Sequence, residues 1–284
     1  MDDLVVFWVF CVFDPNKGGC YVNYNHNLKP SEVRNLIRKG QLNQQTSGLC
    51  GGYAQGNLVV LPQNLAYDFL LFTQRNPKTC PVLEVTNMGS TEFVKSAPNS
   101  NLTLDIPKYR LYENGELTGE YEDIQSLWRM DFVSFLLGCS FTFESALIEE
   151  GINIRHIENG SNVPMYITSI ECEPAGVFSG PVVVSMRPIP SHQLVEVVKI
   201  TSRYPNVHGA PIHIGDPSMI GINNINKPDF GDSVEIKENE VPVFWACGVT
   251  PQAVAMNIKP EIMITHAPGH MFITDIKNHQ LSIV

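Results

Sequence analysis

The segment NLVVLPQNLAYDFLLFTQRNPKTCPVLEVT, residues 57–86, carries the pattern that decides the fold class. Residues 57–61 form an apolar, β-rich run, residues 63–74 have the length of a helix, and residues 81–86 form a second apolar run. The order strand, helix, strand predicts a βαβ unit and therefore an α/β protein. A short amphipathic helix is predicted just before this segment, over residues 31–39.

Short predicted strands and helices alternate along the rest of the chain. Helices are predicted at residues 128–137, 142–150, 192–202 and from Pro251, and strands at residues 153–157, 165–170, 181–186, 211–214, 241–246, 262–265 and 271–274. The break between the first two of these helices, Gly138-Cys139-Ser140, is a further candidate site, for which a structural role is favoured over a functional one.

The order of these elements predicts two domains. A larger three-layer α/β domain is formed by both ends of the chain, residues 28–124 and 209–284, because residues 241–246 are nearly all apolar, as in a central strand buried on both faces. A smaller two-layer α+β domain, residues 125–208, is inserted into it. Residues 1–27 remain unassigned and include a strand-like apolar run.

The composition limits the classes of partner. The chain has 284 residues, and 19 Lys and Arg against 29 Asp and Glu give a formal net charge of −10. This acidic balance argues against nucleic acid or a membrane surface as a partner. Seven cysteines, with no CxxC pair, favour a reducing compartment. With no secretory signal or membrane-spanning run, we expect a cytoplasmic protein, or one of the mitochondrial matrix if the source is eukaryotic.

The segment VPVFWACGVTPQAV, residues 241–254, is the first candidate for a functional site. It places Cys247 and Gly248 at the end of an apolar strand, with Thr250 suited to cap the helix that follows. Such junctions bind ligands in α/β sheets, and their free amides favour an anion. We predict a lowered pKa for Cys247 and a role as acid, base or nucleophile. The alternative is a small cysteine buried under the turn.

Two loops carry the histidines that can do acid–base chemistry. HGAPIHIGDP places His213 and Asp216 after a predicted strand, and THAPGH places His266 and His270 around a Pro-Gly turn. Because both loops follow apolar strands, we expect them to share a sheet edge with Cys247. The Pro-Gly turn excludes a helical HxxxH zinc face, and a metal site of His and Asp stays open as a weaker alternative.

Candidate binding residues come from two patterns. Arg187 and Arg203 each follow a predicted element, and guanidinium groups suit a dicarboxylate, although a surface ion pair is the alternative for each. The Gly-rich CGGYAQGN is neither a phosphate-binding loop nor a dinucleotide fingerprint. Its Tyr53, Gln55 and Asn57 either contact a ligand or satisfy a buried turn.

Several long motifs together resemble the D-glutamate cyclase family. They run from about residue 31 to residue 275 and include GYAQGNLVVLP, FLLGCSFTFESAL, HGAPIHIGDPSMIGI, PDFGD, EVPVFWACGVTPQ and THAPGHMFITD. Gly56 departs from the alanine usual in the family's GYxQAN motif, and residues 1–27 match nothing in the family. The resemblance implies an α/β hydro-lyase of two structural parts that removes water from D-glutamate and closes 5-oxo-D-proline.

This reaction suits the candidate residues. Intramolecular attack of the amine on the γ-carboxyl carbon gains effective molarities of roughly 10⁵ to 10⁸ M, so no cofactor is expected to be required, and a divalent metal is left open. We expect the turn after Gly248 to stabilise the tetrahedral intermediate and Arg187 or Arg203 to hold the α-carboxylate. Cys247 transfers protons or, alternatively, forms a thioester.

The expected ligand is thus a small dicarboxylate amino acid, and a homo-oligomer is an open possibility. Two other functions remain alternatives: a hydro-lyase acting on another small amino or hydroxy acid, and a protein that binds a small carboxylate without chemistry.

Overall fold

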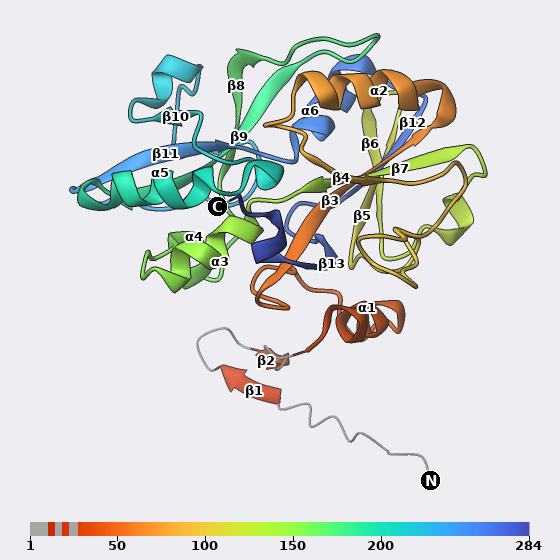
Figure 1. Cartoon of the computed structure of the whole chain (residues 1–284), viewed down its shortest axis with the longest axis horizontal. Coiled ribbons are helices and arrows are strands. Elements are labelled where there is room, and N and C mark those ends of the chain that lie inside the picture. The colour runs from red at the N-terminus through yellow and green to blue at the C-terminus, as the bar shows by residue number, and fades with distance from the viewer. Residues whose placement is uncertain (1–10, 15–18, 23–27, 284) are drawn as a thin grey trace.

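The computed structural model describes residues 11–14, 19–22 and 28–283, and its main elements are two β-sheets flanked by helices (Figure 1). The larger sheet contains β3 (Tyr53–Pro62), β4 (Val82–Val85), β5 (Tyr109–Glu113), β6 (Glu116–Tyr121), β7 (Phe132–Gly138), β12 (Ile262–His266) and β13 (Phe272–Lys277). The smaller sheet contains β8 (Met165–Glu171), β9 (Pro181–Pro190), β10 (His213–Ile214) and β11 (Glu240–Ala246). The α-helices are α1 (Pro30–Arg38), α2 (Gln63–Arg75), α3 (Phe141–Glu149), α4 (Arg155–Glu158), α5 (Leu194–Ser202) and α6 (Thr250–Ile258). A separate hairpin pairs β1 (Cys11–Asp14) with β2 (Gly19–Val22).

The predicted βαβ unit is present in a split form. The larger sheet has the order β4-β7-β3-β12-β5-β6, with β13 also paired to β3. Both β3 and β4 pair antiparallel with β7, so they run parallel to each other with β7 between them. Helix α2 connects them across this strand. The mixed α/β class is therefore confirmed.

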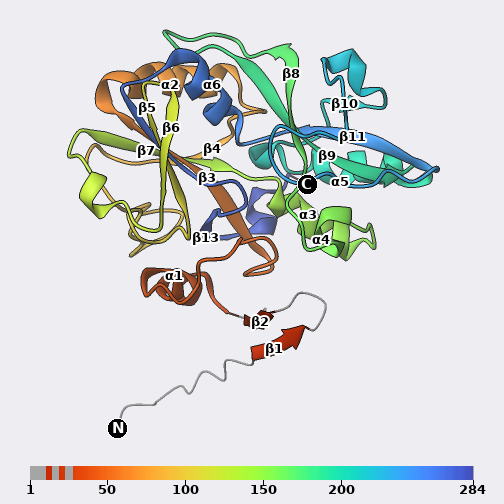
Figure 2. The same ribbon diagram turned by 180° about the vertical axis from the view of Figure 1, so that it is seen from behind.

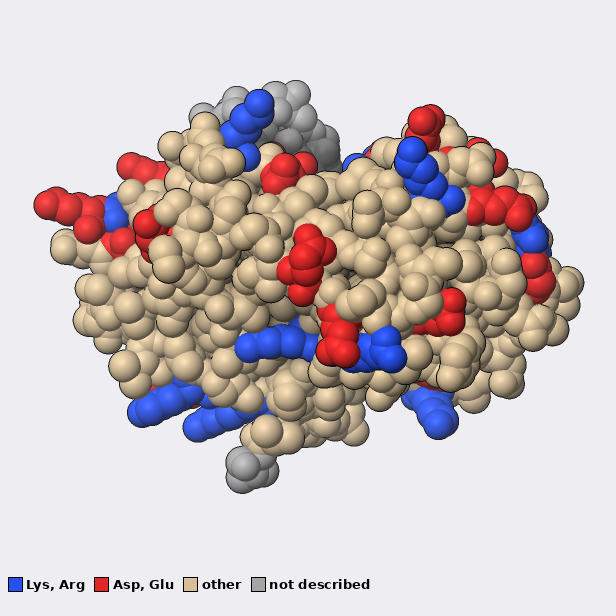
Figure 3. All heavy atoms as spheres, turned by 90° about the horizontal axis from the view of Figure 1, so that it is seen from above, with Lys and Arg blue, Asp and Glu red and all other residues tan. Residues whose placement is uncertain are grey.

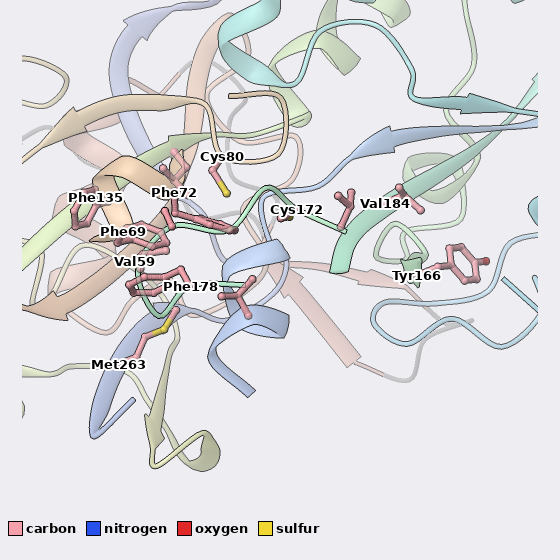
Figure 4. Packing of buried hydrophobic residues seen from close by; sticks show 14 of the residues in the cluster. Val59, Phe69, Phe72, Cys80, Phe135, Tyr166, Cys172, Phe178, Val184 and Met263 are labelled. Carbon is pink, nitrogen blue, oxygen red and sulfur yellow. The ribbon is translucent and has the colours of Figure 1, made fainter. Parts of the chain in front are cut away.

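The main hydrophobic core lies on the α2 face of the larger sheet. Phe69 of α2 packs edge-on against Phe135 of β7, with ring centroids 4.8 Å apart. Phe178, in the loop between β8 and β9, lies 5.1 Å from Phe69 and 6.0 Å from Phe72 (Figure 4). The same cluster continues to Val184 of β9, so one core joins the two sheets.

The opposite face of the larger sheet is covered by an irregular segment, residues 86–108, rather than by helices. Its Phe93, Leu102 and Ile106 are fully buried against the sheet. The smaller sheet, of order β10-β11-β9-β8, packs one face on α3 and α5 around the buried Trp245 (Figure 2). The larger sheet is thus covered by α2 on one face and by an irregular segment on the other, and the smaller sheet by α3 and α5 on one face.

Two predicted elements are wrong. The helix predicted over residues 128–137 is strand β7, because its run FVSFLLG is buried on both faces between β3 and β4, and a short apolar run has no period that separates strand from helix. The strand predicted over residues 153–157 is instead the one-turn helix α4. The remaining predicted strands and helices from residue 31 onward are present with shifted ends. The strand-like run at residues 4–13 falls mostly outside the described residues.

The proposed division into domains at residues 125 and 208 stays a prediction, but the two sheets exchange strands across it. β7, from the predicted insertion, lies in the larger sheet, and β11, from the C-terminal part, lies in the smaller one. Helix α6 then passes between them, because it packs on β9 while its Gln252 accepts a hydrogen bond from Tyr112 of β5. On the face shown in Figure 3, acidic and basic side chains lie scattered among uncharged residues.

Candidate functional site

A narrow cavity lies where strand ends from both sheets meet. It has a volume of about 20 Å³, and its wall includes Asn57 of β3, Cys139 after β7, Cys247 after β11 and His266 at the end of β12. A space of this size holds about one water molecule. The structure therefore brings together four residues that the sequence predicted for the site, Asn57, Cys247, Gly248 and His266, from the region of three different strands.

The turn after β11 is held rigidly by its neighbours. Thr250 donates its hydroxyl to the Cys247 carbonyl at 2.7 Å and accepts from the Val183 amide, so its side chain serves the turn itself. Gly248 lies flat against the Asn57 amide, and a Cβ there would stand 1.9 Å from Asn57 Nδ2. Asn57 in turn donates to the Gly138 carbonyl at 2.7 Å. One amide side chain thus fixes two strand ends.

The pKa of the Cys247 thiol differs from the predicted one. Burial raises its pKa to about 11, although the Val249 and Gly248 amides and the charge of Arg187 act in the opposite direction. The prediction of a lowered pKa is wrong because this junction is inside the protein, where the charged thiolate is poorly solvated. At neutral pH the group is a thiol, which can donate a proton.

Cys139 is a second thiol in the cavity wall, which the sequence analysis assigned to structure. It follows β7 just as Cys247 follows β11, and each cysteine is followed by a small residue and a helix. Burial raises its pKa above the usual range, and the two cysteines are close enough to influence each other's charge. The repeated pattern of apolar strand, cysteine, small residue and helix was the signal that could have identified it.

His266 supplies a polar atom with no protein partner. Its Nδ1 accepts from the Leu58 amide at 3.2 Å, while the Leu58 carbonyl lies farther away, at 3.4 Å. Its Nε2 is buried and has no hydrogen-bond partner among the described residues. Burial lowers the pKa of His266 to about 4. The ring is therefore neutral at pH 7 and can donate a hydrogen bond into the cavity.

Arg187 lies behind the cavity in a buried ion pair. It is 1% exposed and contacts Glu144 through Nε at 2.8 Å, with a second contact through Nη2. Its remaining donors reach the hydroxyls of Ser185 and Ser140, each at 2.9 Å. Burial alone would raise the pKa of Glu144, but the charges of Arg187 and His156 bring it to about 2. The guanidinium therefore fixes the start of α3, where Ser140 lines the cavity.

The other predicted site residues do not line this cavity. His213 lies on the edge strand β10, where its Nε2 contacts the Asp216 carbonyl at 2.7 Å, and Asp216 caps the next turn through Ser218. Arg203 is exposed at the end of α5. Tyr53 and Gln55 line a different cavity, of about 90 Å³.

A larger polar groove adjoins the cavity, because Asn162 lines both. Its volume is about 420 Å³, and it contains His270 together with side chains that sequence analysis did not select. These are Gln45, Lys108, Arg110, Glu120, Asp229 and Asp232. Burial lowers the pKa of His270. Asp229 and Asp232 belong to the motif PDFGD, which gave a signal only through the family resemblance.

No three His, Cys, Asp or Glu side chains gather in a way that could hold a metal ion in the part of the chain that the structure describes. Within that same part, no helix combines the length and apolar character needed to cross a membrane.

Comparisons with known proteins agree on one family. The family model described as D-glutamate cyclase matches residues 133–275. A "Putative hydro-lyase" of Clostridium beijerinckii is 66% identical over 251 residues, 88% of this chain and 96% of the relative. Another, of a Thermoanaerobacter species, is 64% identical over 261 residues, 92% and 98% of the two chains. A nitrogen repressor-like protein from Methanococcus jannaschii aligns over 86% of this chain and 97% of its own with a TM-score of 0.37 and 7% identity, too distant for any argument.

Proposed function

The chain belongs to the D-glutamate cyclase family, and from this premise we propose that it is a hydro-lyase that converts D-glutamate to 5-oxo-D-proline. The observation that carries the proposal is the cavity whose wall includes both a protonated thiol, Cys247, and neutral His266, whose Nε2 has no hydrogen-bond partner among the described residues. Both groups are donors, which is what a departing carboxylate oxygen requires.

The reaction balances without an outside reagent. The ammonium group loses two protons as its nitrogen forms a bond to the γ-carboxyl carbon, and one oxygen of that carboxylate gains two protons and leaves as water. The protein therefore needs groups that move protons over short distances and donors that stabilise the oxyanion of the tetrahedral intermediate. Because the amine and the γ-carboxyl group belong to one substrate molecule, their proximity lowers the barrier to ring closure.

The cavity residues support this chemistry in distinct roles. The Cys247 thiol donates a proton to the departing oxygen, and Cys139 is close enough to exchange a proton with it through the substrate or a water molecule. His266 Nε2 donates to the oxygen that keeps the negative charge, and the Gly248 and Val249 amides beside Cys247 assist it. Because the cavity is small, we place only the γ-carboxyl group in it and the rest of the substrate in the adjoining groove.

The test is direct. Purified, chelator-treated protein is incubated with D-glutamate or L-glutamate, without ATP or nicotinamide, and chiral chromatography measures the lactam. We expect 5-oxo-D-proline from the D-enantiomer, and turnover at least about tenfold lower in Cys247→Ser. No lactam from either enantiomer, with and without added Mg²⁺ or Mn²⁺, would exclude the cyclase and leave the alternatives of another hydro-lyase substrate or of carboxylate binding alone.

A further inference from the structure

The groove beside the cavity is built for a molecule with charges of both signs. Its lining combines Lys108 and Arg110 from the start of β5, here called the basic side, with Asp229 and Asp232 from the loop between β10 and β11, here called the acidic side. We propose that this groove binds the α-amino acid end of the substrate: Lys108 and Arg110 hold the α-carboxylate, and Asp229 and Asp232 face the ammonium group. The inference rests on the proposed function, and it gives the α-carboxylate a different partner from Arg187 or Arg203.

The side chains of Lys108 and Arg110 are held in place by Glu120, but this one carboxylate does not neutralise both of their charges. Arg110 of β5 contacts Glu120 of β6 through Nε at 2.9 Å, and Lys108 Nζ lies 3.8 Å from the same carboxylate. Two cations therefore share one anion. The side chain of Arg110 is 22% exposed and that of Lys108 36%, so both reach the groove while their stems are partly covered. An arginine beside a lysine in such a setting favours a second carboxylate.

The acidic side is oriented by the backbone. Asp229 accepts from the Ile167 amide and Asp232 from the Asn162 amide, each at 2.8 Å and each through Oδ2. Between them, Gly231 packs so closely that a Cβ would lie 2.0 Å from the Val163 carbonyl. This contact pins the loop, so the two carboxylates face the groove from fixed positions.

Asn162 lies where the groove meets the cavity, and His270 lines the groove. His270 Nδ1 contacts the Pro268 carbonyl at 3.1 Å, which leaves Nε2 as an acceptor. The loop that contains His270 is also joined to Lys108, because the Ala267 amide donates to the Lys108 carbonyl. A substrate held by Lys108 and Arg110 would therefore place its nitrogen near His270 and extend its γ-carboxyl past Asn162 toward Cys247. This arrangement specifies the substrate class as an α-amino acid with a second carboxyl group on its side chain.

A pair of substrates that differ only in the α-carboxylate tests the inference. D-Glutamate and 4-aminobutyrate both have an amine four atoms from a carboxyl carbon, but 4-aminobutyrate lacks the α-carboxylate. Lys108→Ala and Arg110→Ala are expected to raise the KM for D-glutamate about tenfold or more, with a much smaller change in kcat, because the lost contact acts in the ground state. The kcat/KM for 4-aminobutyrate, which we expect to be lower than that for D-glutamate, should change by less than about twofold. Lys199→Ala, an exposed lysine of α5 whose partner Glu196 lies 3.9 Å away, is the matched control.

Binding measurements keep this inference separate from the proposed function. Calorimetry with glutarate, which has both carboxylates and no amine, should show weaker binding in Arg110→Ala and unchanged binding in Asp232→Asn. D-Glutamate should bind more weakly to both variants, provided that thermal unfolding shows each of them folded. If no lactam forms but this pattern holds, the proposed function fails and the groove assignment stands. If lactam forms and the KM for D-glutamate is unchanged in both basic variants, the groove assignment is overturned and the function stands.

Discussion

Replacing Arg187 by methionine is expected to destabilise the fold rather than only weaken substrate binding. The guanidinium is 1% exposed and bonded to Glu144, which is itself 2% exposed. Methionine would leave that carboxylate buried without its cation, and breaking a buried pair in this way costs about 3–5 kcal/mol. The pKa of Glu144 gives a second figure: a fall from 4.5 to about 2 corresponds to about 3 kcal/mol at about 1.4 kcal/mol per unit.

The assay is urea unfolding at pH 7, followed by circular dichroism, on wild type and four variants. We expect Arg187→Met and Glu144→Gln each to lose about 3–5 kcal/mol. The double variant should lose less than the sum, because the two residues interact directly. Glu196→Gln, whose lysine partner is 3.9 Å away at the surface, should change stability by less than about 1 kcal/mol.

The pH dependence has a definite sign. Because the folded-state pKa of Glu144 lies below its unfolded value, the stabilisation is fully present above about pH 4.5 and is lost as the pH falls toward 2. The stability difference between wild type and Glu144→Gln should shrink over that window. The reasoning is refuted if Arg187→Met unfolds within about 1 kcal/mol of wild type while its KM for D-glutamate rises, since that pattern belongs to a substrate contact.

Three further outcomes follow from the cavity. Gly248→Ala places a Cβ 1.9 Å from Asn57 Nδ2, so we expect a loss of roughly 1–3 kcal/mol in thermal unfolding together with reduced turnover. Cys247→Ser should keep the wild-type melting temperature while turnover falls at least about tenfold; equal activity would remove the thiol from the mechanism. Because the pKa of His266 is about 4, its ring stays neutral from pH 5 to 8. A step in the activity profile near pH 6.5 that disappears in His266→Gln would contradict this.

The sequence by itself determined much of the secondary structure and one strand-to-helix junction of the site. Continuous apolar runs fix β3 and β11, and the capping pattern at Thr250 and Pro251 fixes the start of α6, because these signals are local. Local signals also placed Cys247 and Gly248 at a strand end. They did not separate strand from helix in the run FVSFLLG, which only pairing with β3 and β4 decides.

Tertiary structure decided which candidates meet and in what state. Cys139, Cys247 and His266 come from strands in two sheets, and strand order between sheets depends on long-range pairing that no local pattern encodes. The sequence predicted both His213 and His266 at the end of an apolar strand, yet β10, which begins at His213, is an edge strand, whereas β12, which ends at His266, is a central one. Tertiary structure also decided the charge state of Cys247. The amides beside Cys247 favour a thiolate, but burial has the larger effect on its pKa and keeps the thiol protonated. This burial exists only once the two sheets have packed together.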